Sequence, residues 1–344
     1  MNFTTTPVRR AAAVAAMAVA TTALLAGCGG GKKPATIAAP PTPTPKAVQP
    51  WRSPFTGLTA GQGKRILVVK IDNTAPSHPQ VGIGKADIGY IEEVEGGLTR
   101  IAAVFSSKLP KTVGPVRSAR ETDIELFAQY GKVAFAYSGA QPAVTRELQA
   151  ANLFLEEDGY GSGWFRGYGR PAPYNLFATP KELLAARPQS AKVHDVGFRF
   201  GSPVSWMRRT GGFSVTYPGA TVTWQWSAAK KRFLLSMGGV PSMTTDGGQV
   251  SADNVIVQYV DVFASRLHDV NGMHTPFSKT VGKGNALFLR NGKLVTGTWS
   301  RANKKAPTIW RVGKSARRYP MQTGKTWIVL VPKGMRVHRI AAHA

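Results

Sequence analysis

The folded part of this chain alternates apolar, strand-like runs with turn residues, and helical spacing is clearest in its first half. The segments 64–71, 87–94, 99–106 and 132–137 are rich in β-branched and aromatic residues, which favours β-strands. Apolar residues recur at helical spacing in three segments, 121–130, 143–151 and 181–186. Strands mixed with helices in this order predict an α/β or α+β N-terminal domain with a mixed sheet over residues 54–200.

Beyond residue 201 the pattern changes to short strands separated by turns. Asn291-Gly292 between two alternating runs is a strong hairpin signal, because both residues tolerate the positive φ of a type I′ turn. The strand candidates are 213–217, 221–226, 232–235, 255–262, 286–290, 293–299, 309–312 and 326–331. We therefore expect a mostly β C-terminal domain over residues 201–334, followed by a basic tail at 335–344.

The first residues have the pattern of an export signal. Arg9-Arg10 precede an apolar, Ala-rich run at 11–25, which is too short for a membrane span of about 20 residues. Leu25-Ala26-Gly27-Cys28 then resembles a bacterial lipobox, in which Cys28 is lipidated and becomes the mature N-terminus. An ordinary signal peptide with an incidental thiol is the alternative. We expect a signal peptide at 1–27 and a lipid-anchored, extracytoplasmic protein; the arginine pair does not distinguish Sec from Tat export.

A Pro-rich tether follows the lipobox. Residues 28–53 contain Pro40-Pro41-Thr42-Pro43-Thr44-Pro45 and little that could be buried, which predicts an extended, semi-rigid spacer of polyproline type. Cys28 is the only cysteine, so the chain forms no internal disulfide and must be stabilised by core packing.

The chain is strongly basic, with 44 Lys and Arg against 18 Asp and Glu. From Ser265 to Ala344 the only acid is Asp269, so the second half carries most of the excess. Outside the cytoplasm the available polyanions are phospholipid headgroups and anionic wall polymers, and nucleic acid is not an expected partner. The alternative is that the charge serves only solubility.

One stretch runs against this trend, because residues 87–125 hold seven acids interleaved with Arg100, Arg117 and Arg120. Ser118 and Glu121 fit a capping box at the start of the 121–130 helix. This would place Arg117 and Arg120 beside free backbone donors, where a phosphate or carboxylate is readily bound. The alternative is that these arginines pair with Glu92, Glu93 or Glu95.

Three carboxylates are candidates for catalysis. Asp72, followed by Asn73, lies just past the first strand, where ligand-binding residues of open α/β sheets tend to lie. Alternation along the next strand would put Glu93 and Glu95 on one face and Glu92 on the other. Such acids could act as acid and base or hold a divalent cation. The alternative is an internal lattice of ion pairs.

Other catalytic signatures are missing from the sequence. The six histidines have no metal-ligand spacing, no Gly-x-Ser-x-Gly elbow is present, and the segment 282–285 lacks the ending of a phosphate loop and is predicted to be a turn. We therefore predict no metal site of recognisable spacing and no cofactor other than an optional divalent cation.

The segment 160–176 predicts a loop, because it holds four glycines and two prolines. Aromatic residues in a loop suit stacking on sugar rings or clamping a peptide, and arginines among them favour a binding surface. The alternative is that the aromatics fold back over the core. The candidate ligand-binding residues here are Trp164, Arg166, Tyr174 and Asn175, which join Asn73, Arg100, Arg117, Ser118 and Arg120.

Two motifs of the acidic stretch, Glu95-Gly96-Gly97-Leu98-Thr99-Arg100 and Gly114-Pro115-Val116-Arg117-Ser118-Ala119-Arg120, recur in a known family. With Pro173-Tyr174-Asn175-Leu176 and, in the second half, Gly297-Thr298-Trp299 and Gly324-Lys325-Thr326-Trp327, they resemble the YerB-like lipoprotein family, also called the DUF3048 family. The resemblance covers about residues 54–332. It implies a two-domain bacterial envelope lipoprotein and supplies no catalytic residues. Glu92-Glu93 stand where the family tends toward a single acid, which leaves open which of the two belongs to a site.

The sequence thus predicts a lipid-anchored cell-envelope protein that binds an anionic or glycan wall component, or an envelope enzyme. The rival hypotheses are a carboxylate- or metal-dependent hydrolase of cell-wall material, using Asp72, Glu93 and Glu95, and a structural scaffold. Acids converging in an open pocket would favour the hydrolase, and full pairing with buried arginines would favour the scaffold.

Overall fold

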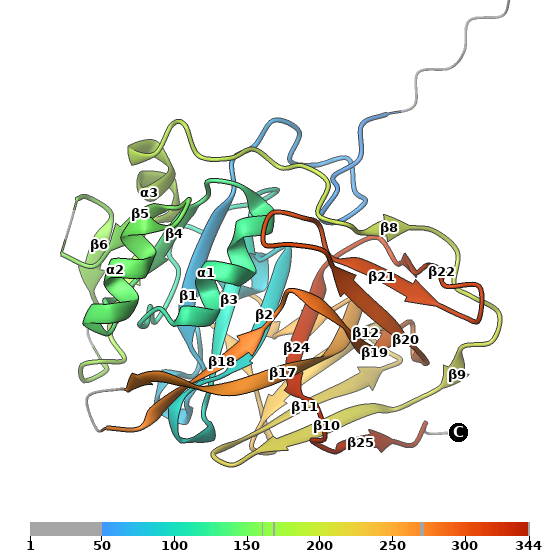
Figure 1. Ribbon diagram of the computed structural model, residues 1–344. Coiled ribbons are helices and arrows are strands. Elements are labelled where there is room, and N and C mark those ends of the chain that lie inside the picture. Colours follow the sequence, from blue (N-terminus) through green and yellow to red (C-terminus); the bar gives the residue numbers. More distant parts are fainter. Residues whose placement is uncertain (1–49, 160, 168, 269–271, 343–344) are drawn as a thin grey trace, which may run out of the picture. The chain divides into compact units, whose positions relative to one another are not determined.

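The computed structural model describes residues 50–159, 161–167, 169–268 and 272–342, and its first half mixes strands with short helices (Figure 1). The strands are β1 (Leu67–Asp72), β2 (Ile88–Glu93), β3 (Thr99–Phe105), β4 (Ala134–Tyr137), β5 (Phe154–Glu157), β6 (Trp164–Arg166) and β7 (Leu176–Ala178). The helices are α1 (Glu121–Phe127), α2 (Pro142–Ala150) and α3 (Pro180–Ala186), with 3₁₀ turns η1 (Ala75–Ser77), η2 (Ile83–Lys85), η3 (Glu95–Gly97) and η4 (Ala128–Tyr130).

The second half consists of strands. They are β8 (Arg199–Phe200), β9 (Arg208–Arg209), β10 (Gly212–Tyr217), β11 (Ala220–Ser227), β12 (Arg232–Met237), β13 (Val240–Pro241), β14 (Met243–Thr244), β15 (Gly248–Gln249), β16 (Ser251–Ala252), β17 (Asn254–His268), β18 (His274–Lys279), β19 (Gly282–Arg290), β20 (Lys293–Arg301), β21 (Ile309–Val312), β22 (Arg317–Arg318), β23 (Pro320–Met321), β24 (Thr326–Pro332) and β25 (Val337–Ile340). The predicted fold class, a mixed-sheet first half and a mostly β second half, is confirmed.

One large sheet joins the two halves. In the described part of the chain it has 13 strands, in the order β22-β21-β20-β19-β17-β24-β2-β3-β1-β4-β5, with β18 beside β17 and β9 beside β20. Strand β24, near the end of the chain, lies between β2 and β17 and runs parallel to both. The sheet is mixed, because β3 is antiparallel to β1 and β2 while β4 is parallel to β1 and β5.

Each face of this sheet is covered by a separate apolar layer. Helix α1 lies over β1 and β3 (Figure 1), and its Leu126 and Phe127 pack with Val68 and Tyr90. On the opposite face, residues such as Val69 pack against a six-stranded sheet in the order β13-β12-β11-β10-β25, with β16 beside β12. Side chains of one strand therefore point alternately into two cores, which positions the polar residues at the strand ends.

Several details differ from the sequence prediction. The segment 282–285 is not a turn but the start of β19, paired with β20. Strand β17 is longer than predicted, because its outer part forms an arm with β18. Part of the predicted basic tail forms β25, an edge strand on β10. Asn291 and Gly292 have positive φ, as the predicted hairpin turn requires.

The predicted signal peptide, Cys28 and nearly all of the tether lie outside the described residues. Among the helices that are described, none is long and apolar enough to cross a membrane.

Candidate functional site

A buried lysine bridges two carboxylates beneath α1. Lys70 on β1 is fully buried; its Nζ lies 2.7 Å from Asp123 Oδ1 and contacts Glu92 Oε1. In the sheet, β3 separates β1 from β2, and Ala102 stands beside Lys70 in register, so its small side chain lets the lysine reach across. Burial lowers the pKa of Lys70 to about 8, and Asp123 opposes this effect. The group joins β1, β2 and α1.

The end of β1 carries a second group of ion pairs on the same face. Asp72 is fully buried, and its Oδ2 lies 2.7 Å from Arg117 Nε. Its Oδ1 accepts hydrogen bonds from the backbone N–H and hydroxyl of Thr74, both at 2.7 Å, and lies 3.7 Å from an Arg100 nitrogen. Burial lowers the pKa of Arg100 to about 10, against the attraction of Asp72. Asp72 thus forms ion pairs with two arginines.

Glu95 and Arg120 form a third pair. Nε and a terminal nitrogen of Arg120 donate to Glu95 Oε2 at 2.8 and 2.6 Å, and Thr275 on β18 donates to Oε1 at 2.6 Å. Burial alone would raise the pKa of Glu95, but Arg120 and Thr275 outweigh it and hold the pKa below its usual value. The pair fastens η3 and the β18 arm to the start of α1.

The predicted capping box is wrong in detail. Helix α1 begins at Glu121 as predicted, but its N-cap is Arg120, whose backbone N–H donates to Asp123 Oδ2 at 2.7 Å. Ser118 lies before the cap, and its hydroxyl donates to the Ser138 carbonyl at 3.3 Å. A carboxylate from the first turn therefore already occupies the helix start.

Glu93 and Glu95 do not share a face, contrary to the alternation argument. Strand β2 ends at Glu93, and the reversal into η3 turns Glu95 toward α1, the side of Glu92. Glu93 lies on the opposite face near Tyr217, half-buried and with no ion-pair or hydrogen-bond partner among the described residues, and burial raises its pKa. The three candidate catalytic carboxylates therefore do not converge.

The aromatic segment is partly a hairpin. Strands β6 and β7 pair, and Trp164 packs, half-buried, against the core on the α3 side. Arg166 is exposed, with one nitrogen 3.1 Å from Asn175 Oδ1 and another 3.0 Å from Asp158 Oδ2. Tyr174 lies under the Arg117 guanidinium, 5.8 Å from ring centroid to Cζ. Residues 160 and 168 lie outside the described part.

The charge cluster is therefore mainly self-paired. Arg100, Arg117 and Arg120 each contact a buried or nearly buried carboxylate, and their side chains are 6%, 22% and 16% exposed, respectively. No set of three His, Cys, Asp or Glu residues in the described ranges is arranged to hold a metal ion. Such an arrangement fastens elements together and leaves Arg117 as its most accessible cation.

A pocket that sequence reasoning missed lies on the other face of the same strand end. It has a volume of about 590 Å³, and its walls come from both halves of the chain: 73–75, His78, Leu98 and Thr99 from the first half, 216–221, 237–238 and 240–241 from the second. At its floor Asn73 Nδ2 donates to Thr99 Oγ1 at 2.8 Å. Its lining contains no Asp, Glu, Lys or Arg. Of the residues that line this pocket, the sequence indicated only Asn73 as a candidate for ligand binding. Most of the other lining residues are distant from Asn73 in the chain.

The Glu95-Gly96-Gly97 motif builds one wall of this pocket. Gly97 has φ +66°, and a Cβ there would lie 2.6 Å from Pro218. Its carbonyl accepts the Gly219 N–H at 3.1 Å. The motif is glycine-rich because two turns from opposite halves of the chain touch backbone to backbone, which only glycine allows here.

Comparisons with known proteins identify relatives of this chain. Residues 55–194 match the family model described as the N-terminal domain of DUF3048, a protein of unknown function, and residues 213–328 match its C-terminal domain. A Bacillus subtilis (strain 168) protein named "Putative lipoprotein YerB" is 28% identical over 306 residues, covering 84% of this chain and 88% of that protein.

A solved structure has the same fold. The crystal structure of YerB from Bacillus subtilis covers 83% of this chain and 99% of its own, with a TM-score of 0.71 and 24% identity. At that identity the likeness concerns the fold alone.

Proposed function

The chain belongs to the DUF3048 family, and on that basis we propose that it is a lipid-anchored binding protein of the cell envelope whose ligand is a glycan-containing wall component. The anchor is the predicted Cys28, and the relative's name as a lipoprotein supports it. The predicted tether would hold the folded part away from the membrane.

The observation that carries the proposal is the pocket between the two halves. A concave site with apolar walls and a few uncharged hydrogen-bonding groups suits a neutral ligand such as a sugar unit. Leu98, Met237 and Val240 supply apolar surface, and Asn73 and Thr99 supply polar atoms at the floor. Because the walls come from both halves, an occupant would contact both.

Hydrolysis is supported less well by the same geometry. A retaining or inverting glycosidase needs two carboxyl groups facing one bond. Here Asp72 and Glu95 pair with arginines beneath α1, and Glu93 lies alone on the other face.

A scaffold role is favoured by a specific observation, namely the self-pairing of the charge cluster. Lys70, Arg117 and Arg120 each join different elements. We assign this cluster to holding the fold, and binding to the pocket beside it.

The test uses the lipidated protein, purified from membranes in detergent, and soluble neutral glycan strands released from cell wall. Val240 is 66% exposed at the rim, so Val240→Trp should narrow the pocket without disturbing the core. We expect calorimetric affinity to fall at least tenfold, about 1.4 kcal/mol.

Leu109→Trp is the matched control, because Leu109 is 38% exposed and does not line the pocket. It should bind like the parent protein. Equal binding of the glycan by the parent and the Val240→Trp variant would exclude the pocket as the binding site. Release of new reducing ends from the glycan during incubation would favour the hydrolase hypothesis instead.

A further inference from the structure

A long groove crosses the second half of the large sheet, on strands β17, β19 and β20. Three adjoining hollows of about 370, 710 and 560 Å³ share their walls. Tyr259 and Asn285 belong to both the first and the second, and Trp206 and Thr296 to both the second and the third. The shared residues make one continuous groove, open along its length, rather than three separate pockets.

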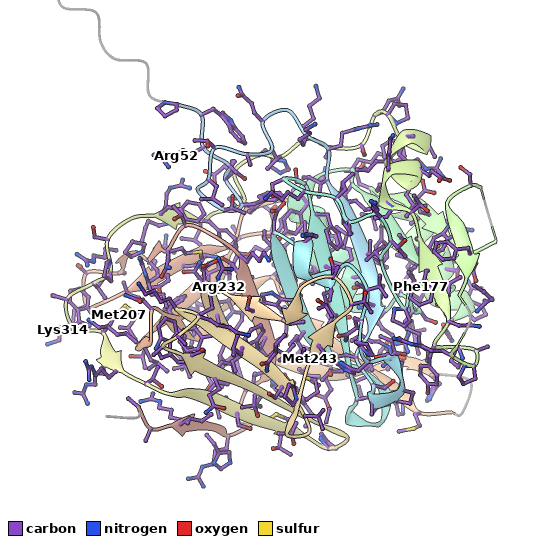
Figure 2. All side chains as sticks on the ribbon, turned by 180° about the vertical axis from the view of Figure 1, so that it is seen from behind. Arg52, Phe177, Met207, Arg232, Met243 and Lys314 are labelled. Carbon is purple, nitrogen blue, oxygen red and sulfur yellow. The ribbon has the colours of Figure 1, made fainter. Side chains whose placement is uncertain are left out.

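Cations line the groove from end to end. Lys333 lies in its first hollow, Lys314 in the second, and Arg208 and Arg339 in the third, and all four side chains are exposed. No acid lines any of the three hollows in the described part of the chain; the nearby Asp261 pairs with Lys333 at 2.7 Å. Figure 2 shows Lys314 at the edge of the molecule opposite Phe177, so the groove lies far from the aromatic segment.

Between the cations the floor is uncharged and contains aromatic rings. Trp206 is 48% exposed, and the Arg317 guanidinium lies over its ring, 4.7 Å from the centroid. Asn285, Thr296 and Thr298 present hydroxyl and amide groups beside it. An exposed tryptophan held by an arginine offers a flat surface to an apolar face of a ligand, with positive charge next to it.

We propose that this groove binds a linear polyanion of the cell wall, a chain of polyol or sugar units joined by phosphodiesters. The row of cations matches a repeating negative charge, and Trp206 and the hydroxyl-lined floor suit the units between phosphates. The groove is concave, which fits a single chain better than the flat surface of a membrane.

This inference rests on the envelope location in the proposed function, but its site is separate from the neutral pocket. It also gives a physical role to the excess of Lys and Arg in the second half. The groove would hold the anionic polymer at the protein, and the pocket would bind a neutral sugar unit.

The experiment measures binding of the detergent-solubilised lipidated protein to linear poly(glycerol phosphate) over a range of salt concentrations. In the triple variant Arg208→Gln/Lys314→Gln/Arg317→Gln we expect affinity at low salt to fall about 100-fold. The slope of log affinity against log salt should flatten by about two, because each lost cation releases about 0.7 counterion fewer from a single-chain polyanion. Trp206→Ala should lower affinity about tenfold with the slope unchanged, because it removes no charge.

The matched control is Lys230→Gln/Lys279→Gln/Lys304→Gln, which removes three exposed charges from outside the groove. It should retain affinity within about threefold. An equal loss in the control would overturn the proposal, since net charge alone would then explain binding. Binding to phosphatidylglycerol vesicles without binding to the polymer would also overturn it and make the surface a membrane contact.

Glycan binding in the pocket and polymer binding in the groove can be refuted independently of each other. The groove variants should bind neutral glycan normally, and Val240→Trp should bind poly(glycerol phosphate) normally. Loss of polymer binding by Val240→Trp, with groove variants unaffected, would assign the polymer to the pocket and refute the groove.

Discussion

Replacing Lys70 by methionine tests whether the buried charges hold the first half of the fold. Methionine has nearly the length of lysine but no charge, so the packing beneath α1 changes little. The variant leaves Glu92 and Asp123 buried with no cation between them. Glu92 is affected most, because apart from Lys70 neither of its carboxylate oxygens has a partner in the described part of the chain.

The expected cost follows from these environments. Removing one partner of a buried ion pair typically costs about 3–5 kcal/mol, since the other charge stays desolvated. Asp123 retains its hydrogen bond from the Arg120 N–H, so most of the loss comes from Glu92. The double variant Lys70→Met/Glu92→Gln removes the orphaned charge and should recover at least about 2 kcal/mol.

Urea unfolding of both variants and the parent measures this directly, as a shift of the midpoint at constant slope. Lowering the pH should also reduce the penalty of the single variant, because Glu92 can then be protonated. A loss below about 1 kcal/mol in Lys70→Met, or a double variant no more stable than the single one, would refute the assignment of this cluster to stability.

Four further substitutions test other parts of the fold and the site. Gly97→Ala should cost at least about 2 kcal/mol in urea unfolding, because alanine is strained at positive φ and its Cβ would meet Pro218. Gly89→Ala should cost about 1–3 kcal/mol by the same measurement, because its Cβ would lie 2.5 Å from the ring of Trp327. Because the pKa of Glu95 is lower in the folded than in the unfolded chain, its ionised form stabilises the fold above the unfolded pKa of about 4.3. This stabilisation is lost as the pH falls through the folded pKa. In thermal melts Glu95→Gln should therefore be less stable than the parent at neutral pH and approach the parent's stability in acid. The pKa of Glu93 is raised by burial, so its ionised form destabilises the fold at neutral pH. Glu93→Gln should therefore be more stable than the parent at pH 7, and this gain in stability should vanish below the ordinary glutamate pKa.

Local patterns predicted the elements well because they depend on neighbouring residues. The β-branched runs became β1 to β4, and the helical spacing at 121–130 became α1 and η4. The pairing of strands could not be predicted in this way. Nothing near residue 326 indicates that β24 will lie beside β2, because that choice depends on packing between residues more than 200 positions apart.

The candidate site shows the same limit. The sequence located the charged residues and offered their mutual pairing as an alternative, but alternation could not reveal that the chain reverses between Glu93 and Glu95. A glycine-rich turn changes the side of the sheet on which the next residue lies. The sequence did not predict the neutral pocket, because its lining carries no charge. The lining residues form no motif in the sequence, and only folding brings the two distant turns together.

The position of β24 has a consequence for how the large sheet assembles while the chain is made. Until residue 332 is available, β2 has only one neighbour, so the first half has an open sheet edge with unpaired backbone groups. The large sheet can be completed only after residue 332 has been synthesised. If the proposed export carries the chain across a membrane unfolded, the large sheet can form only once β24 has crossed. A chain truncated before β24 would present an edge prone to aggregation.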